Sequence, residues 1–460
     1  MPEPTTQPTT TQPPTTQPLT GWGCTAPTTA VVDEPARVAD VVAAVRSPAR
    51  AVLARGLGRC YGDAAQSAGG RVLSTRRMAD LALDGQGGTA LVGAGCSIDE
   101  LLRVAVPRGW FVPVTPGTRF VTIGGAIAAD VHGKNHHVDG AFGRHVRRLE
   151  LADGTGTTRR LSPTDDPEAF WATVGGLGLT GVVTRAEISL RPVESSWMRV
   201  TTARAGSLDA LMSGLREHDR RFPYTVAWID LITRGRAFGR GVLTSGDHAT
   251  AGDVLAAGVT DPLAYGPAAR VTVPPLPWSA VTRPAGRAFN ALWFRRAPQL
   301  QEGALQPLAA FFHPLDGVRA WNRVYGPRGF LQYQFVVPDG REDVIEDAAA
   351  VLHRAGCPPF LAVLKRFGAA GPAPLSFPRP GWTLAMDLPV GTGDRLAHAL
   401  DALDARVAAA GGAVYLVKDA RCRPDLVARM YPGLQAWRSV RDRLDPHRRF
   451  ASDLSRRLNL

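Results

Sequence analysis

The chain has 460 residues and carries 53 Lys and Arg against 41 Asp and Glu, a net charge of +12 that favours anionic partners. The arginines are scattered rather than clustered, which argues against a nucleic-acid-binding protein. No apolar run reaches the roughly 18 residues of a transmembrane helix. Five widely spaced cysteines without a CxxC pair indicate reduced thiols and no metal pattern.

Residues 1–19 are rich in Thr, Gln and Pro and lack the basic start and apolar middle of a secretory signal. This composition predicts a disordered tail. With no signal and no spanning helix, we expect a protein that is cytoplasmic or peripheral at the cell membrane.

From residue 20 to 194 short strands alternate with helical segments. We expect a strand at 51–54, a hairpin at 149–161, a helix at 166–174 and a strand at 182–190. A helix over 97–106 should begin at Ser97, because Glu100 three residues later completes a capping box.

From residue 195 to 411 the expected strands and helices are longer than in the N-terminal part, and this pattern predicts an α+β domain with an antiparallel sheet. Helices are expected at 342–355 and 395–410, and strands at 360–367 and 382–388. Residues 412–460 should hold one strand, 413–417, followed by Arg-rich helices.

Three glycine-rich segments lie beside strands in the N-terminal part, at 54–63, 115–137 and 175–181. Gly and Ala let a backbone approach a flat ring closely, and successive N–H groups with little side-chain bulk can hold a pyrophosphate. The first segment lacks the spacing of a Rossmann fingerprint, and taken alone it is better interpreted as a plain glycine-rich turn. Together the three predict one extended cofactor that crosses several loops.

Only three of the 53 basic residues are lysines: Lys134, Lys365 and Lys418. A lysine's pKa can be lowered by burial whereas an arginine stays charged, so all three are active-site candidates, with chance survival as the alternative. Gln332 and Gln334 share one face of a strand and would bind hydroxyl groups there, unless that face meets solvent.

Three histidines in the second glycine-rich segment could suggest a metal site. The spacing of His132, His136 and His137 does not match H-E-x-x-H, and no metal is expected. His136 and His137 are interpreted as structural. His132 differs, because it ends the glycine- and alanine-rich stretch against which a flat cofactor would lie.

Several motifs carry a family resemblance over nearly the whole folded chain, among them ARGLGR at 54–59, VHGKNHH at 131–137, FWATVGG at 170–176, HPLD at 313–316, FLQYQF at 330–335, PLSFP at 374–378 and Lys418-Asp419. The chain resembles the FAD flavoprotein oxidases of the vanillyl-alcohol oxidase type, also called PCMH-type. The resemblance implies a two-domain α+β fold with an FAD domain (20–194) that the C-terminal segment (412–460) rejoins, and a substrate domain (195–411) between them.

The resemblance also implies site residues. The FAD contacts would be Ala54, Arg55, Gly56, Leu57, Gly58, Arg59, Cys60, Tyr61, Gly62, Asp63, Ala64, Gly117, Thr118, Thr122, Ile123, Gly124, Gly125, Ala129, Asp130, Val131, His132, Val183 and Tyr415. The substrate contacts would be Gln334, Lys365, Thr383, Ala385 and Lys418, with Lys418 and His132 as the catalytic candidates. FAD is expected to be non-covalent, because Arg59 stands where covalent relatives carry a flavin-linked His.

More narrowly, the chain resembles the branch of this family that acts in actinobacterial cell-wall synthesis. It implies oxidation of the ribose C2′ hydroxyl of decaprenylphosphoryl-β-D-ribose to a 2′-keto sugar, the first half of epimerisation to the arabinose donor for arabinan. An NAD(P)H-dependent short-chain keto-reductase would be the partner, and an anionic membrane a contact.

The chain departs from relatives at three positions. Cys60 replaces a Ser of the pyrophosphate loop, where backbone donors should still suffice. Thr383 for Asn and Ala385 for Cys concern fine substrate or inhibitor preference and not the reaction class. The alternatives are a sugar or aldonolactone oxidase with a soluble substrate, and a non-catalytic nucleotide-binding or membrane-adaptor protein.

Overall fold

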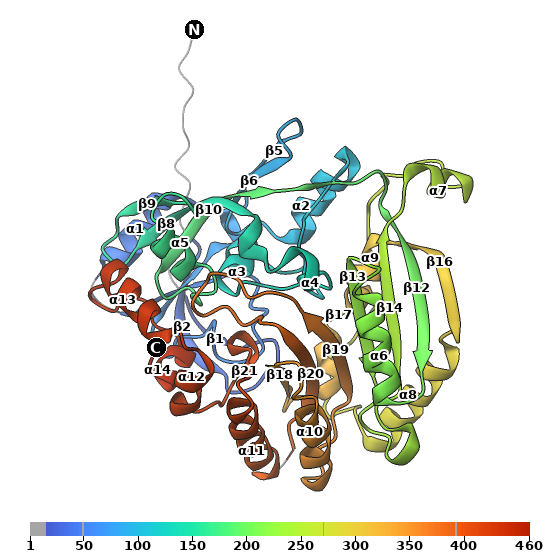
Figure 1. The fold of residues 1–460 in the computed structure, drawn as a ribbon. Helices are drawn as coiled ribbons and strands as arrows, with labels where there is room; N and C mark the ends of the chain where they lie inside the picture. Colours follow the sequence, from blue (N-terminus) through green and yellow to red (C-terminus); the bar gives the residue numbers. More distant parts are fainter. Residues whose placement is uncertain (1–14, 48–49, 270, 392) are drawn as a thin grey trace.

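The computed structural model describes residues 15–47, 50–269, 271–391 and 393–460 (Figure 1). Three main β-sheets organise this part of the chain, and the expected α+β class is confirmed. None of the described helices is long and apolar enough to cross a bilayer.

The first sheet has the strand order β1-β2-β4-β3 and carries the first glycine-rich loop at the end of β3. Strands β2, β4 and β3 are parallel, whereas β1 pairs antiparallel with β2. The elements are β1 (Thr15–Leu19), β2 (Thr28–Asp33), α1 (Val38–Arg46), β3 (Val52–Arg55) and β4 (Arg71–Ser74).

The predicted disorder of residues 1–19 is therefore wrong for Thr15–Leu19, which form β1; residues 1–14 lie outside the described part. The composition of the segment does not show that β2 has an open edge, and a threonine-rich segment can pair with such an edge. Pro18 is tolerated because β1 is an edge strand.

The second sheet is antiparallel with the order β5-β6-β10-β8-β9. Its predicted hairpin is confirmed, and so are the helix at 166–174, the strand at 182–190 and the capping box, in which Glu100 N donates to Ser97 Oγ at 3.1 Å. The elements are β5 (Leu81–Asp84), β6 (Thr89–Gly93), α2 (Ile98–Ala105), β7 (Trp110–Phe111), α3 (Ile123–Ala128), α4 (His136–Asp139), β8 (Val146–Asp153), β9 (Thr158–Leu161), α5 (Pro167–Thr173), β10 (Gly181–Ser189) and β11 (Arg191–Pro192).

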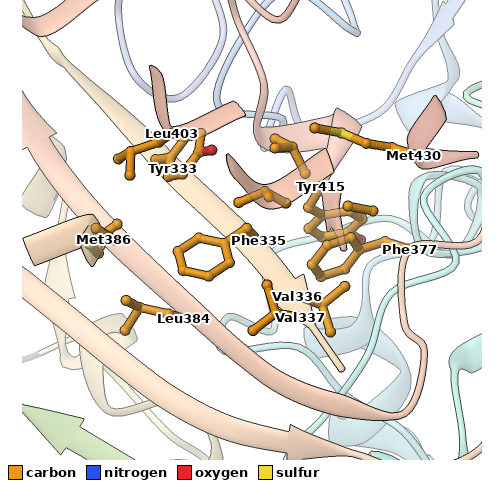
Figure 2. Close-up of a cluster of buried hydrophobic side chains, with 14 of the residues drawn as sticks. Tyr333, Phe335, Val336, Val337, Phe377, Leu384, Met386, Leu403, Tyr415 and Met430 are labelled. Atoms are coloured by element: carbon orange, nitrogen blue, oxygen red, sulfur yellow. The ribbon is translucent and has the colours of Figure 1, made fainter. Parts of the chain in front are cut away.

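The third sheet has eight strands in the order β16-β12-β14-β13-β19-β20-β18-β21, every pair antiparallel. Phe335, Leu384 and Met386 of this sheet pack with Leu403 in one core cluster (Figure 2). The elements are β12 (Trp197–Ala205), α6 (Leu208–His218), β13 (Tyr224–Ile229), β14 (Gly241–His248), α7 (Ala251–Ala256), β15 (Val271–Thr272), α8 (Arg283–Arg296), β16 (Leu300–Pro307), α9 (Leu308–Phe312), β17 (Val318–Arg319), β18 (Phe330–Val337), α10 (Asp343–Arg354), β19 (Leu361–Phe367), β20 (Gly381–Pro389), α11 (Arg395–Ala409) and β21 (Ala413–Val414).

The C-terminal segment returns to the first sheet. Val52 N donates to Arg449 O at 2.8 Å and Ala451 N donates to Val52 O at 3.1 Å, so this segment runs along β3. Its helices are α12 (Pro424–Met430), α13 (Leu434–Leu444) and α14 (Asp453–Leu458).

The predicted strand 413–417 is too long. Only Ala413–Val414 pair with β18, and Leu416–Lys418 form a 3₁₀ turn. Lys418 therefore ends a turn and not a strand, and this turn brings the chain to the first glycine-rich loop, where Tyr61 N donates to Val417 O at 3.1 Å.

Candidate active site

A cavity of about 330 Å³ lies where the first glycine-rich loop, α3, β10, the third sheet and the turn before Lys418 meet. All three glycine-rich segments contribute to its wall, as the sequence predicts. Most of the expected site residues line it: Ala54, Arg55, Gly56, Leu57, Gly58, Arg59, Cys60, Tyr61, Ala64, Gly117, Thr118, Thr122, Gly124, Gly125, Ala129, Val131, His132, Val183, Tyr415, Gln334, Lys365, Ala385 and Lys418.

Five expected residues stand behind this wall. Gly62 packs so tightly that a Cβ there would lie 1.9 Å from Asp419 O. Asp63 accepts hydrogen bonds from Arg457 at 2.8 and 3.0 Å, which ties α14 to the loop. Ile123 is fully buried in the core under α3.

Asp130 and Thr383 are the other two residues behind the wall. Asp130 has a φ of +39° and accepts hydrogen bonds from Gly143 N and Ser376 Oγ, so it fixes the turn that precedes His132. Thr383 accepts a 3.0 Å hydrogen bond from Gln334 Nε2 and donates to Phe335 O, so it orients the Gln334 amide.

Gln332 lines the cavity beside Gln334, as the shared strand face predicts. Further lining residues belong to the second and third glycine-rich segments without having been expected individually: Pro116, Val121, Ala128, Leu177, Gly178 and Gly181. The others gave no local signal, because the fold brings them together from distant parts of the chain: Trp22, Ala65, Thr75, Ala94, Thr173, Leu315, Trp321, Leu361, Val363 and Val417.

The glycines of the wall fit a bulky flat group. A Cβ on Gly117 or Gly178 would meet nothing within 4 Å, so both face open space, whereas one on Gly56 would lie 2.1 Å from Thr122 Oγ1. Among the described residues, the structure gives no acceptor for the backbone N–H groups of Leu57, Gly58 and Arg59. Adjacent free N–H groups of this kind suit an anion such as a pyrophosphate.

One end of the cavity is polar and is built around His132. Lys365 Nζ lies 3.2 Å from His132 Nδ1, and Gln334 Nε2 lies 3.2 Å from His132 Nε2. His132 also packs edge-on against Phe367, with ring centroids 4.7 Å apart. Both ring nitrogens are therefore engaged by protein groups, and the ring has one fixed orientation.

Lys418 reaches the same end from the C-terminal segment. Its Nζ lies 5.4 Å from the ring centre of Tyr61 and 5.8 Å from that of Tyr415. Within the described residues Nζ has no hydrogen-bond partner, unlike Lys365 and His132. Lys418 is thus a cavity-facing amine that can bond to a ligand hydroxyl.

Burial shifts the proton affinities of this cluster. It lowers the pKa of Lys418 to about 8, against the opposing charge of Asp387. Burial and the charge of Lys418 lower the pKa of Lys365 to about 7. Burial, with Lys365 and Lys418 nearby, holds the pKa of His132 well below its usual range, so His132 is neutral at pH 7.

The third lysine does not join this site, so its prediction as an active-site residue is corrected. Lys134 is buried, donates a hydrogen bond to Phe311 O and lies 4.3 Å from the Phe311 ring centre. A backbone carbonyl and a ring face satisfy its ammonium inside the protein.

His136 and His137 also stay outside the cavity lining. Nδ1 of His136 accepts a hydrogen bond from Gly368 N, and His137 Nε2 lies 3.0 Å from Phe222 O. In the part of the chain that the structure describes, no three His, Cys, Asp or Glu side chains are grouped to hold a metal ion.

A second cavity of about 380 Å³ adjoins the first, and Trp22, Arg59 and Trp321 line both. The Arg59 guanidinium lies 3.8 Å from the ring centre of Trp22 and forms no ion pair within the described residues. A cation with spare hydrogen-bonding capacity therefore stands at the junction of the two cavities.

Comparison with known proteins agrees with this geometry. Residues 28–162 match the FAD binding domain family model. Decaprenylphosphoryl-beta-D-ribose oxidase of Mycolicibacterium smegmatis is 40% identical, over 96% of this chain and 97% of the relative. The chain belongs to this family of FAD-dependent oxidases.

Two further relatives mark the extent of the likeness. An uncharacterised protein of Streptomyces coelicolor is 42% identical over 79% of this chain and all of its own length. Cytokinin dehydrogenase 8 of rice is 31% identical over 33% of this chain and 31% of its own. The protein is thus an FAD-dependent oxidoreductase, and the non-catalytic alternative is set aside.

Proposed function

We propose that this enzyme oxidises the C2′ hydroxyl of decaprenylphosphoryl-β-D-ribose to the 2′-keto sugar. The observation that carries the proposal is the cavity itself, which joins a wall of glycines to a polar end of His132, Lys365, Gln334 and Lys418. The full-length likeness to the M. smegmatis oxidase supports the choice of substrate.

The loop after β3 and the N-terminus of α3 would hold FAD. The N–H groups of 57–59 would receive its pyrophosphate, and the open faces of Gly117 and Gly178 would leave room for the rest. Val183 and Tyr415 would flank the cofactor. When bound, FAD supplies the acceptor for the hydride that leaves the carbinol carbon.

Lys418 is the group that we assign to the hydroxyl proton. Loss of a carbinol hydride is easier when the hydroxyl proton also leaves or the developing alkoxide is stabilised. The Nζ atom of Lys418 has no hydrogen-bond partner in the described part of the chain, and its pKa of about 8 lets it act as a neutral base near pH 8. His132 is neutral too but both of its nitrogens are engaged, which makes it the second choice.

The rest of the polar end would position the sugar. Lys365 and Gln334 offer hydrogen bonds to the remaining ribose hydroxyls, and Ala385 leaves space beside them. Arg59 faces both cavities and can meet the phosphate of the substrate as a charge-assisted donor.

A 2′-keto sugar must be reduced from the opposite face to give the arabinose epimer. An NAD(P)H-dependent short-chain keto-reductase is the class of partner that would consume this product. Because the substrate carries a polyprenyl chain, we also propose that the enzyme works at a membrane surface.

The test is anaerobic flavin reduction by defined substrates, followed by loss of absorbance near 450 nm. Polyprenylphosphoryl ribose should reduce the flavin and yield a 2′-keto product by mass spectrometry, whereas free ribose and aldonolactones should not. Reduction by a soluble sugar or lactone, with none by the lipid-linked ribose, would assign the alternative sugar-oxidase function instead.

A further inference from the structure

Residues 271–300 form an apolar surface segment that the fold leaves uncovered. Only Gly286 and Asn290 in this segment are buried. Of the eleven large apolar side chains that are exposed among the described residues, six lie here: Val271, Trp278, Phe289, Leu292, Trp293 and Leu300. Trp278 is 68% exposed and Trp293 is 50% exposed, which is unusual for tryptophan on a soluble face.

The helix α8 is anchored by one face only. Asn290 Nδ2 donates to Asp230 Oδ1 at 2.8 Å, and a Cβ on Gly286 would lie 2.8 Å from Ile232, so this face is closely packed. The rings of Phe289 and Trp293 stack beside this face, with centroids 6.2 Å apart, yet both side chains remain about half exposed. Figure 1 shows α8 at the lower right, beside the outer strands of the third sheet.

The charged side chains of this segment are all positive. No Asp or Glu occurs between Asp261 and Glu302, whereas α8 alone carries four arginines. Arg287, Arg295 and Arg296 are exposed. Exposed tryptophan together with arginine on a short helix is the composition of an interfacial membrane helix, in which apolar rings enter the lipid and cations meet anionic headgroups.

The segment also lies against the wall of the active-site cavity. Its strand β15 pairs with β17, and Ala280 N donates to Val324 O at 2.8 Å. On either side of β17, Leu315 and Trp321 line the cavity. At α8, the Phe289 ring lies 5.9 Å from Phe360, the residue before the cavity-lining Leu361.

We propose that residues 271–300 dock the enzyme on the surface of an anionic lipid bilayer. The exposed rings would insert at the headgroup level while the arginines of α8 bind lipid phosphates. The cavity wall would then face the bilayer, which shortens the path of a lipid-linked substrate; this last step rests on the proposed function, but docking itself does not.

The test uses the full-length enzyme and vesicles without substrate. The enzyme should sediment with phosphatidylcholine vesicles that contain about 30% phosphatidylglycerol, bind pure phosphatidylcholine at least tenfold more weakly, and be released by salt. The double variant Trp278→Ser, Trp293→Ser and the variant Arg295→Gln, Arg296→Gln should each bind at least tenfold more weakly. Leu255→Ser, an exposed apolar position on α7, is the matched control and should bind like the parent.

Unchanged flavin absorbance shows that each variant is folded and loaded. Absence of binding by the parent, or undiminished binding by both double variants, would overturn the proposal. Self-association in sedimentation that the tryptophan variant abolishes, without vesicle binding, would assign the surface to a second copy of the chain instead. Failure of the ribose substrate to reduce the flavin would count against the proposed function alone.

Discussion

Lys365 Nζ lies 3.2 Å from Nδ1 of His132, although 233 residues separate the two in sequence. A neutral imidazole has one donor and one acceptor nitrogen, so this contact also governs the other nitrogen. When the Lys365 amine is neutral, His132 Nδ1–H can donate a hydrogen bond to Nζ, and His132 Nε2 can accept one from Gln334. When Lys365 is charged, its Nζ donates to His132 Nδ1 instead. The proton of the imidazole is then on Nε2, which must find an acceptor. The pKa of about 7 for Lys365 places this switch near neutral pH.

Lys365→Met should raise the pKa of His132, because it removes the nearest positive charge while burial persists. The pKa should stay below the ordinary 6.5, since burial is the larger cause. NMR titration of labelled histidine measures the change. Lys134→Met is the control: it removes a buried lysine that acts on Lys365 and His313, so His132 should hardly move.

Flavin reduction should become faster as the pH rises through about 8. Burial lowers the pKa of Lys418 to about 8, and the neutral amine that can accept a proton is the form present above that value. The neutral fraction is about a tenth at pH 7 and about nine tenths at pH 9, so we expect a roughly tenfold rise followed by a plateau. Stopped-flow reduction across this range measures it, and a rate that falls above pH 8 would instead mean that Lys418 acts as a cation.

Lys418→Arg should retain FAD and fold but slow flavin reduction by roughly a hundredfold, the usual scale for a lost base or electrostatic group. The guanidinium is bulkier and keeps its proton. The pH dependence near 8 should vanish in this variant. Reduction as fast as in the parent would move the assignment to His132.

The sequence predicted well those features that depend on neighbouring residues. The capping box of Ser97 and Glu100, the hairpin at 149–161 and the three glycine-rich segments each have a local chemical signature, and each was found where expected. The scarcity of lysine pointed to Lys365 and Lys418, but it could not separate them from Lys134, whose partner is a carbonyl 177 residues away.

What the sequence missed depends on long-range packing. Strand β1 exists because β2 offers an edge, and β21 ends early because the chain must turn to reach the loop at Tyr61. Trp22 and Trp321 meet at the cavity with ring centroids 6.0 Å apart, although they lie far apart in the sequence. No periodicity or spacing in the sequence predicts such a contact.

All of the yellow colour should leave the protein on acid precipitation. A covalent link needs a nucleophilic side chain beside the flavin ring. The resemblance places the flavin-linked His of covalent relatives at the position of Arg59, which lies here against the Trp22 ring, and His132 is the only histidine among the described lining residues. Colour retained in the washed pellet would identify a covalent adduct and refute this prediction.

Iodoacetamide at pH 7.5 should alkylate Cys24 at least tenfold faster than Cys60. Cys24 is exposed, whereas burial raises the pKa of the cavity-lining Cys60 to about 11 and leaves very little thiolate. Ala385 offers no thiol at the polar end. Peptide mapping over time measures both rates, with Cys24→Ser as the control, and equal rates would show that Cys60 is not protected.

Arg457→Ala should lower the free energy of unfolding by about 3 kcal/mol, the scale for breaking a buried ion pair. Arg457 donates to Asp63 behind the first glycine-rich loop and to Asp419 beside Lys418, at 2.8 to 3.0 Å, so its loss leaves the buried Asp419 and the partly buried Asp63 without this partner. Its neighbour Arg456, which is more exposed and pairs with Asp453, is the matched control and should cost less than about 1 kcal/mol as alanine. Urea unfolding followed by tryptophan fluorescence measures both.

Because Arg457 ties α14 to the loop that we assign to the pyrophosphate, the variant should also release FAD more readily. An equal loss of stability in the two variants would show that the Asp63–Arg457–Asp419 cluster does not hold the C-terminal segment against the loop.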